Sequence, residues 1–147
     1  MEYFINNAPD VLHRAKYSAM RERSIGLGTM GFHSYLQSKK IPFGSALAKG
    51  QNISMFRHIK LQAEETSRKL AEEKGEAPDM VGTGLRNAHL LAIAPNATSS
   101  IICGSTSPSI EPLRANVYSQ KTMSGTFLMK NKYLEKYINV LLTFQFY

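Results

Sequence analysis

A short apolar run in the second half of the chain is the feature that most limits which folds the chain can adopt. The run is His89-Leu90-Leu91-Ala92-Ile93-Ala94, and it is followed directly by Pro95, which cannot donate to a sheet's hydrogen bonds. Continuous hydrophobicity over a few residues is typical of a strand covered on both faces, as in parallel sheets flanked by helices. The run therefore predicts a buried strand within an α/β fold.

The residues before this run predict a helix-rich first half. Residues 9–23 have helical composition, and a second helix is expected after the glycines of residues 26–31, ending at Ile41-Pro42. The longest helix is predicted from Asn52 to Gly75. Its apolar stripe is formed by Met55, Phe56, Ile59, Ala63, Leu70 and Ala71, and its opposite face is charged. Residues 116–128 predict two short extended pieces around Ser124-Gly125.

Composition excludes several classes of protein. Of the 147 residues, 43% are hydrophobic and 20% are charged, which is ordinary for a folded domain and excludes intrinsic disorder. The single cysteine excludes an internal disulfide and any multi-cysteine metal site, and it fits a reducing compartment. No run approaches the ~20 apolar residues of a membrane helix, and the N-terminus has no signal-peptide core. We therefore expect a cytoplasmic protein with no membrane partner.

The net charge of +7 leaves the kind of partner open. A basic chain invites a nucleic-acid interpretation, but the Lys and Arg residues are spread out and never form a run of three. Phosphate-bearing small molecules explain the charge equally well, and so does a truncated surface that has lost its acidic neighbours. The sequence therefore disfavours nucleic acid as a partner.

Two glycine- and hydroxyl-containing segments are candidates for phosphate binding. Residues 26–31 spell G-x-G-x-x-G, but the dinucleotide fingerprint needs a buried strand before it and a carboxylate about twenty residues later, and both are missing. Close packing at a helix start explains these glycines better. Pro95-Asn96-Ala97-Thr98-Ser99-Ser100 follows the predicted strand and offers hydroxyl and backbone donors for a phosphate. An ordinary loop with capping residues explains that segment equally well.

No other residues form a convincing chemical site. Cys103 follows Ile101-Ile102 and has no nearby histidine to activate it, so we interpret it as a buried packing residue. The four histidines show no metal-ligand spacing. We therefore expect no catalytic residue and no metal ligand in this chain.

Three stretches of the chain resemble the large, catalytic subunit of class I ribonucleotide reductase. They are RERSIGLGTMGFHSYLQSKKIPFGS, RNAHLLAIAPNATSSIICGSTSPSIEP and NVYSQKTMSGTFL. The resemblance implies that the chain is a partial segment of a ten-stranded α/β barrel. It also implies an enzyme that reduces ribonucleoside diphosphates to deoxyribonucleotides for DNA synthesis. By the same resemblance, Asn96, Ala97, Thr98 and Ser99 bind the substrate diphosphate.

The resemblance also implies partners and parts that this chain lacks. The family's large subunit forms a homodimer, binds ATP or dNTP effectors, and receives a radical from a metal-containing small subunit. Its chemistry uses several cysteines and two adjacent tyrosines, whereas this chain has one cysteine and no Tyr-Tyr pair. We therefore expect no cofactor in this chain, and no activity without the remainder of the large subunit.

The resemblance runs from about residue 5 to about residue 137, and we expect residues 1–138 to be the partial barrel domain. Residues 139–147 differ from the family and form an apolar tail, as read-through in an interrupted or truncated gene would produce. The alternative from another class is a stand-alone module that binds a nucleotide or phosphate without catalysis. Recovery of reductase activity with the missing pieces would distinguish the two.

Overall fold

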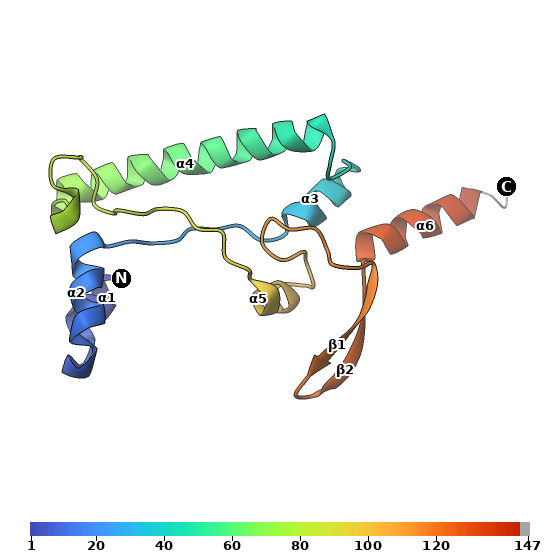
Figure 1. The fold of residues 1–147 in the computed structure, drawn as a ribbon. Helices are drawn as coiled ribbons and strands as arrows, with labels where there is room; N and C mark the ends of the chain where they lie inside the picture. The colour runs from blue at the N-terminus through green and yellow to red at the C-terminus, as the bar shows by residue number, and fades with distance from the viewer. Residues whose placement is uncertain (145–147) are drawn as a thin grey trace. The chain divides into compact units, whose positions relative to one another are not determined.

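The computed structural model describes residues 1–144, without the side chains of Thr122 and residues 140–144. It is rich in helix, with one small sheet near the C-terminus (Figure 1). The α-helices are α1 (Glu2–Asn7), α2 (His13–Glu22), α3 (Phe32–Ser38), α4 (Ala46–Lys74), α5 (Ala97–Ile102) and α6 (Lys132–Phe144). Short 3₁₀ turns are η1 (Asp10–Leu12) and η2 (Pro78–Met80), and the strands are β1 (Val117–Thr122) and β2 (Gly125–Lys130). The helix-rich first half is confirmed.

The chain forms two compact units. The first unit contains residues 1–28 and 51–93, and the second contains residues 29–50 and the chain from residue 94 onward. Most of α4 belongs to the first unit, and its first turn belongs to the second.

Helix α4 confirms the predicted amphipathic pattern. All six residues of the predicted stripe are half-buried, and the charged positions are mostly exposed. Gly75 ends the helix as predicted, because its φ of +80° is a conformation that glycine adopts without strain. The helix begins six residues before the predicted start: the Ser45 hydroxyl accepts a hydrogen bond from the Ala48 N–H at 3.2 Å and caps it.

Residues 89–94 are extended, but the predicted buried strand is wrong. The Ile25 N–H donates to the His89 carbonyl at 2.9 Å, and the Ala92 N–H donates to the Leu27 carbonyl at 3.1 Å. Only Leu27 and Leu91 form a parallel bridge, and Ile93 is 73% exposed. A parallel strand is buried only between two neighbours and beneath helices, whereas among the described residues this one pairs along a single edge.

A cluster of three charged side chains joins helices of the first unit. One carboxylate oxygen of Glu2 accepts hydrogen bonds from Arg23 at 2.5 Å and from Arg86 at 2.6 Å. Arg86 is buried, and its guanidinium also donates to the carbonyls of Lys74 and Gly75 at the end of α4. The cluster therefore joins α1, the end of α2 and the end of α4.

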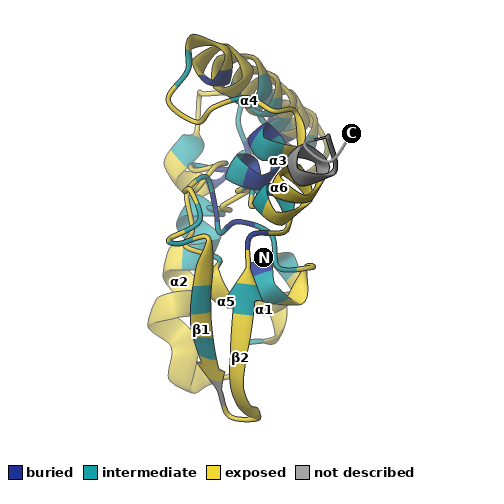
Figure 2. Cartoon of the chain, turned by 90° about the vertical axis from the view of Figure 1, so that its right-hand side faces the viewer, coloured by how far each residue is buried: buried dark blue, intermediate teal, exposed yellow. Residues whose placement is uncertain are grey.

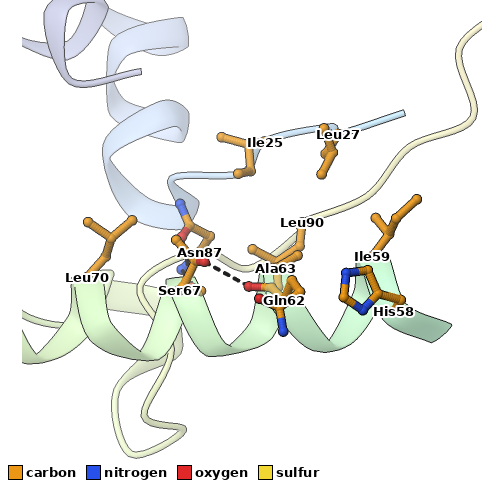
Figure 3. Close-up of a pocket in the computed structure, with 11 residues that line it drawn as sticks. Ile25, Leu27, His58, Ile59, Gln62, Ala63, Ser67, Leu70, Asn87 and Leu90 are labelled. Atoms are coloured by element: carbon orange, nitrogen blue, oxygen red, sulfur yellow. Dashed lines mark hydrogen bonds between the residues drawn. The ribbon is translucent and has the colours of Figure 1, made fainter. Parts of the chain in front are cut away.

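A second polar cluster fastens α4 to the extended segments. The Ser67 hydroxyl donates to the Asn87 side-chain oxygen at 2.8 Å (Figure 3). The Asn87 side-chain amide in turn donates to the Arg23 carbonyl at 2.8 Å. Both side chains are buried, so these bonds satisfy polar groups that would otherwise be costly to bury.

The second unit is built around α3 and a β-hairpin. In α3, Phe32, Ser34 and Leu36 are buried, and Leu36 has no exposed surface. β1 and β2 pair antiparallel, with Val117 opposite Lys130 and Thr122 opposite Gly125, which confirms the predicted extended pieces. Most residues of the hairpin are exposed (Figure 2). Helix α6 begins after Asn131, whose side-chain oxygen accepts hydrogen bonds from the Tyr133 and Leu134 N–H groups.

The Glu2 cluster makes the stability of the chain depend on pH. The two arginines lower the pKa of Glu2 from 4.5 to about 2. The carboxylate is therefore more acidic in the folded chain than in the unfolded one, and its stabilisation is complete above pH 4.5 and lost as the pH falls toward 2. Glu2→Gln should lower the melting temperature by a few degrees at pH 7 and flatten its pH dependence between pH 4.5 and 2.

Glu73→Gln is the matched control, because Glu73 is exposed on α4 and no ion pair is seen for it among the described residues. Melting curves followed by circular dichroism at one protein concentration make the comparison. Equal curves for the Glu2 and Glu73 variants would show that the cluster does not stabilise the chain.

The exposed hairpin predicts self-association of the isolated chain. An isolated two-stranded sheet is marginal, and Phe127 and Leu128 on β2 are half-exposed or more. Unpaired strand edges and exposed apolar side chains favour association with other chains. Sedimentation velocity of the chain made alone should show oligomers. A monomer with a sharp cooperative melt would contradict this prediction.

Candidate functional site

The hydroxyl-rich segment predicted to bind phosphate forms the start of α5. Asn96 precedes the helix with a left-handed backbone conformation, φ 50° and ψ 29°. Its carbonyl accepts the Ser100 N–H at 2.9 Å, but its side chain makes no capping bond. Asn96 is half-buried, whereas Ala97, Thr98 and Ser99 are exposed. The structure thus places all four predicted residues together on one turn of chain.

The exposed turn presents several hydrogen-bond donors. Among the described residues, the N–H groups of Ala97, Thr98 and Ser99 have no hydrogen-bond acceptor, as expected for the first turn of a helix. The hydroxyls of Thr98 and Ser99 lie on the same turn and are likewise without a partner in the part of the chain that is described. Exposed N–H and O–H donors with little side-chain bulk suit the oxygens of a phosphate group.

The inner side of α5 is held by its own hydrogen bonds. Ser100 is buried, and its hydroxyl donates to the Ala97 carbonyl at 2.8 Å. The Ser100 carbonyl accepts the Thr106 N–H at 3.0 Å, and the Ile101 carbonyl accepts the Ser105 N–H at 3.0 Å. The loop that follows α5 therefore folds back onto the helix.

The glycines of residues 26–31 pack closely, as predicted. A Cβ atom on Gly26 would lie 2.8 Å from the Ala92 Cβ, and one on Gly28 would lie 2.6 Å from the Ala92 carbonyl oxygen. Gly31 has a φ of +84°, and a Cβ there would lie 2.7 Å from the Thr106 hydroxyl. The carboxylate required about twenty residues later is absent, so the geometry supports close approach rather than dinucleotide binding.

The prediction that Cys103 is buried is wrong. Cys103 is exposed and ends α5, where its N–H donates to the Ser99 carbonyl at 2.9 Å. A helix of six residues buries only one side, and here that side carries Ser100 while Ile102 faces solvent. Among residues 1–144, no group of three metal-binding side chains comes together.

Two histidines, His33 and His89, make contacts outside the α5 segment. The His33 ring nitrogen Nδ1 accepts the Leu113 N–H at 3.1 Å, and burial lowers the pKa of His33. His89 contacts the Ser24 hydroxyl at 2.9 Å in the other unit. Both contacts hold segments of chain together.

The first unit contains a hollow with a mainly apolar lining. It measures about 370 Å³ and lies between α4 and the paired extended segments (Figure 3). Ile25, Leu27, Ile59 and Leu90 are among the residues that line it. This mainly apolar lining offers few donors for an anion, so the start of α5 remains the better candidate site.

Two buried serines, one of them in the loop after α5, were not predicted from the sequence. Ser34 of α3 and Ser107 of the loop after α5 are both buried and hydrogen-bonded to each other. The available signal was the position of Ser34 between Phe32 and Leu36, where a small polar residue in an apolar stretch indicates a partner.

Comparison with known proteins connects this geometry to a family. The sequence profile described as "Ribonucleotide reductase, barrel domain" matches residues 1–83 and 78–143, which include the α5 segment. The chain belongs to the ribonucleotide reductase barrel-domain family. The match reaches residue 143, and α6 crosses residue 138 without a break, so the boundary proposed there stays a prediction. Residues 145–147 of the predicted tail lie outside the described residues.

Individual relatives agree with the family. The chain is 54% identical over 136 residues to the ribonucleoside-diphosphate reductase large subunit of Invertebrate iridescent virus 3, covering 92% of this chain and 22% of the relative. It is 32% identical over 157 residues to the Caenorhabditis elegans large subunit, covering 85% and 20%. The chain thus spans about a fifth of the length of these relatives.

A solved structure shares the fold. The class Id ribonucleotide reductase alpha subunit of Actinobacillus ureae matches with a TM-score of 0.81 and 38% sequence identity. The match covers 94% of this chain and 25% of that subunit. The α/β fold expected for this chain, as a partial barrel segment, is confirmed. Among the described residues, no helix is both long and apolar enough to cross a membrane.

The close packing at Gly28 predicts a cost for any side chain there. Gly28→Ala should destabilise the chain by about 1–3 kcal/mol, because its Cβ would collide with the backbone oxygen of Ala92. Gly50→Ala is the control: Gly50 lies inside α4 with open space around it, and alanine should stabilise the helix by up to about 1 kcal/mol. Melting temperatures at one protein concentration test both variants. An unchanged melting temperature in Gly28→Ala would disprove the close approach of Gly28 to Ala92.

Proposed function

We propose that this chain is a segment of a ribonucleoside-diphosphate reductase large subunit. The complete enzyme converts ribonucleoside diphosphates to deoxyribonucleoside diphosphates, the precursors of DNA. The observation that carries the proposal is the family match across a turn whose donors are open and exposed. Similarity to named large subunits supports the same reaction class.

Within that enzyme, the start of α5 holds the substrate's diphosphate. Thr98 and Ser99 donate hydroxyl hydrogen bonds, and the N–H groups of Ala97, Thr98 and Ser99 donate from the backbone. Asn96 begins the turn with its left-handed backbone, and the three residues that carry these donors are exposed. These residues bind and orient the substrate and take no part in bond breaking.

The chemistry itself requires parts that lie outside this chain. One exposed cysteine cannot supply both a radical-forming thiol and a reducing thiol pair. The remainder of the large subunit, a second large subunit and a small radical-generating subunit are therefore the proposed partners, with ATP or dNTP effectors bound elsewhere. The cytoplasm, where dithiols stay reduced, is the proposed compartment.

Complementation tests the proposal against a simple phosphate-binding module. The chain is co-expressed with the flanking pieces of a large subunit and with a small subunit, and diphosphate reduction is measured. Recovered activity that depends on this chain supports the reductase assignment. ADP binding by the chain, without activity in any assembly, would favour the binding module.

Two hydroxyl substitutions test the phosphate contacts in such an assembly. Thr98→Val keeps the side-chain shape and removes a donor to a charged group, a bond worth about 1.5–3 kcal/mol. It should therefore raise KM for a ribonucleoside diphosphate about ten- to a hundredfold. Ser99→Ala should act similarly, whereas Ala97→Gly should matter less because only its backbone is proposed to bind.

Cys103→Ser is the control for these variants. Cys103 is exposed at the far end of the same helix, so activity per folded enzyme should be retained. Steady-state KM and kcat are measured for all four variants. If KM is unchanged in both hydroxyl variants and turnover is lost only in Cys103→Ser, the functional group of this site is the Cys103 thiol and not the two hydroxyls.

A further inference from the structure

Two buried serines join α3 to the loop that follows α5. The Ser34 N–H donates to the Ser107 hydroxyl oxygen at 3.0 Å, and the Ser107 N–H donates to the Ser34 hydroxyl oxygen at 2.9 Å. Ser34 is 2% exposed and Ser107 is fully buried. The two reciprocal bonds close a ring between segments that lie far apart in the sequence, and each satisfies a buried backbone amide.

The contact between these segments continues beyond the serine pair. The Gly31 N–H donates to the Ser107 carbonyl at 2.8 Å, immediately before α3 begins. Gly31 also lies so close to the Thr106 hydroxyl that a Cβ atom would not fit between them. Three successive contacts thus fasten residues 106–107 to the start of α3.

The fastened residues are directly connected to α5. The Thr106 N–H donates to the Ser100 carbonyl on the buried side of that helix at 3.0 Å. Between them the chain passes through Gly104 and Ser105, which have positive φ angles of 81° and 53°. A non-glycine residue at positive φ is held there by its surroundings, so this loop depends on outside contacts to keep its shape.

We propose that Ser34 and Ser107 are positioning residues for diphosphate capture. The inference rests on the proposed function, in which Thr98 and Ser99 bind the substrate. Neither serine touches the diphosphate; the pair holds the loop to α3, the loop holds Ser100, and Ser100 fixes the turn that carries the donors. Loss of either hydroxyl leaves a buried amide without an acceptor, which favours detachment of the loop.

Alanine variants of the full chain test this role. Ser34→Ala and Ser107→Ala each remove one acceptor, and Ser38→Ala is the matched control. Ser38 lies on the same helix, is exposed, and its hydroxyl donates only to the nearby Tyr35 carbonyl. Hydrogen exchange is measured at the Ser100 and Cys103 amides of α5, with β1 and β2 amides as the internal reference. ADP affinity is measured for each variant in the assembly with the flanking large-subunit pieces and the small subunit.

Both serine variants should exchange the α5 amides about tenfold faster and bind ADP about tenfold more weakly than the unchanged chain. Ser38→Ala should change neither quantity. Ser34→Thr keeps the acceptor oxygen and should behave like the unchanged chain. Equal loss in Ser34→Thr and Ser34→Ala would assign the effect to packing and overturn the proposal.

The remaining outcomes separate this inference from the proposed function. If the assembly that contains the unchanged chain does not bind ADP, the proposed function fails and the positioning role falls with it. If that assembly binds ADP, and both alanine variants keep native exchange and affinity, only the positioning role is overturned.

Discussion

The close approach of two extended segments at glycine is the constraint on which the first unit depends. Residues 25–28 and 89–92 exchange backbone hydrogen bonds, and Gly26 and Gly28 lie against Ala92 with no room for a side chain. At these two positions, atoms of Ala92 fill the space that a side chain would need. Glycine fits there because it has no side chain, and the two backbones can therefore approach closely enough to form hydrogen bonds. After this paired segment, the chain continues to Pro95 and the start of α5.

Buried polar groups carry much of the tertiary organisation. Among the described residues, the buried apolar side chains are Ile5, Phe32, Leu36, Ala48 and Ala77, and the buried polar ones include Arg86, Asn87, Ser34 and Ser107. Each of these four polar residues bonds to a segment distant in sequence. Buried hydrogen bonds are directional, so they fix which segments meet more narrowly than apolar contact does. The same kind of bond supports the proposed phosphate site.

Local patterns predicted the elements well where the signal was periodic. The stripe of α4, its end at Gly75 and the hairpin around Ser124-Gly125 follow from side-chain spacing and from turn chemistry. On α4, Glu65 forms an ion pair with Lys69, and Glu64 forms one with Lys60. Burial was harder to predict: Ile93 and Cys103 are both exposed, because their burial depends on which other segments cover them.

The sequence by itself determined the family and the main helices of the first half, and it singled out the residues 96–99 that we propose bind a phosphate. These depend on spacing along the chain and on residue types that the chain carries in order. Only the tertiary structure revealed that Ser34 meets Ser107, that Glu2 meets Arg86, and that Gly28 faces Ala92. These contacts join residues that are far apart in the sequence. The order of residues alone does not show which of them come together when the chain folds.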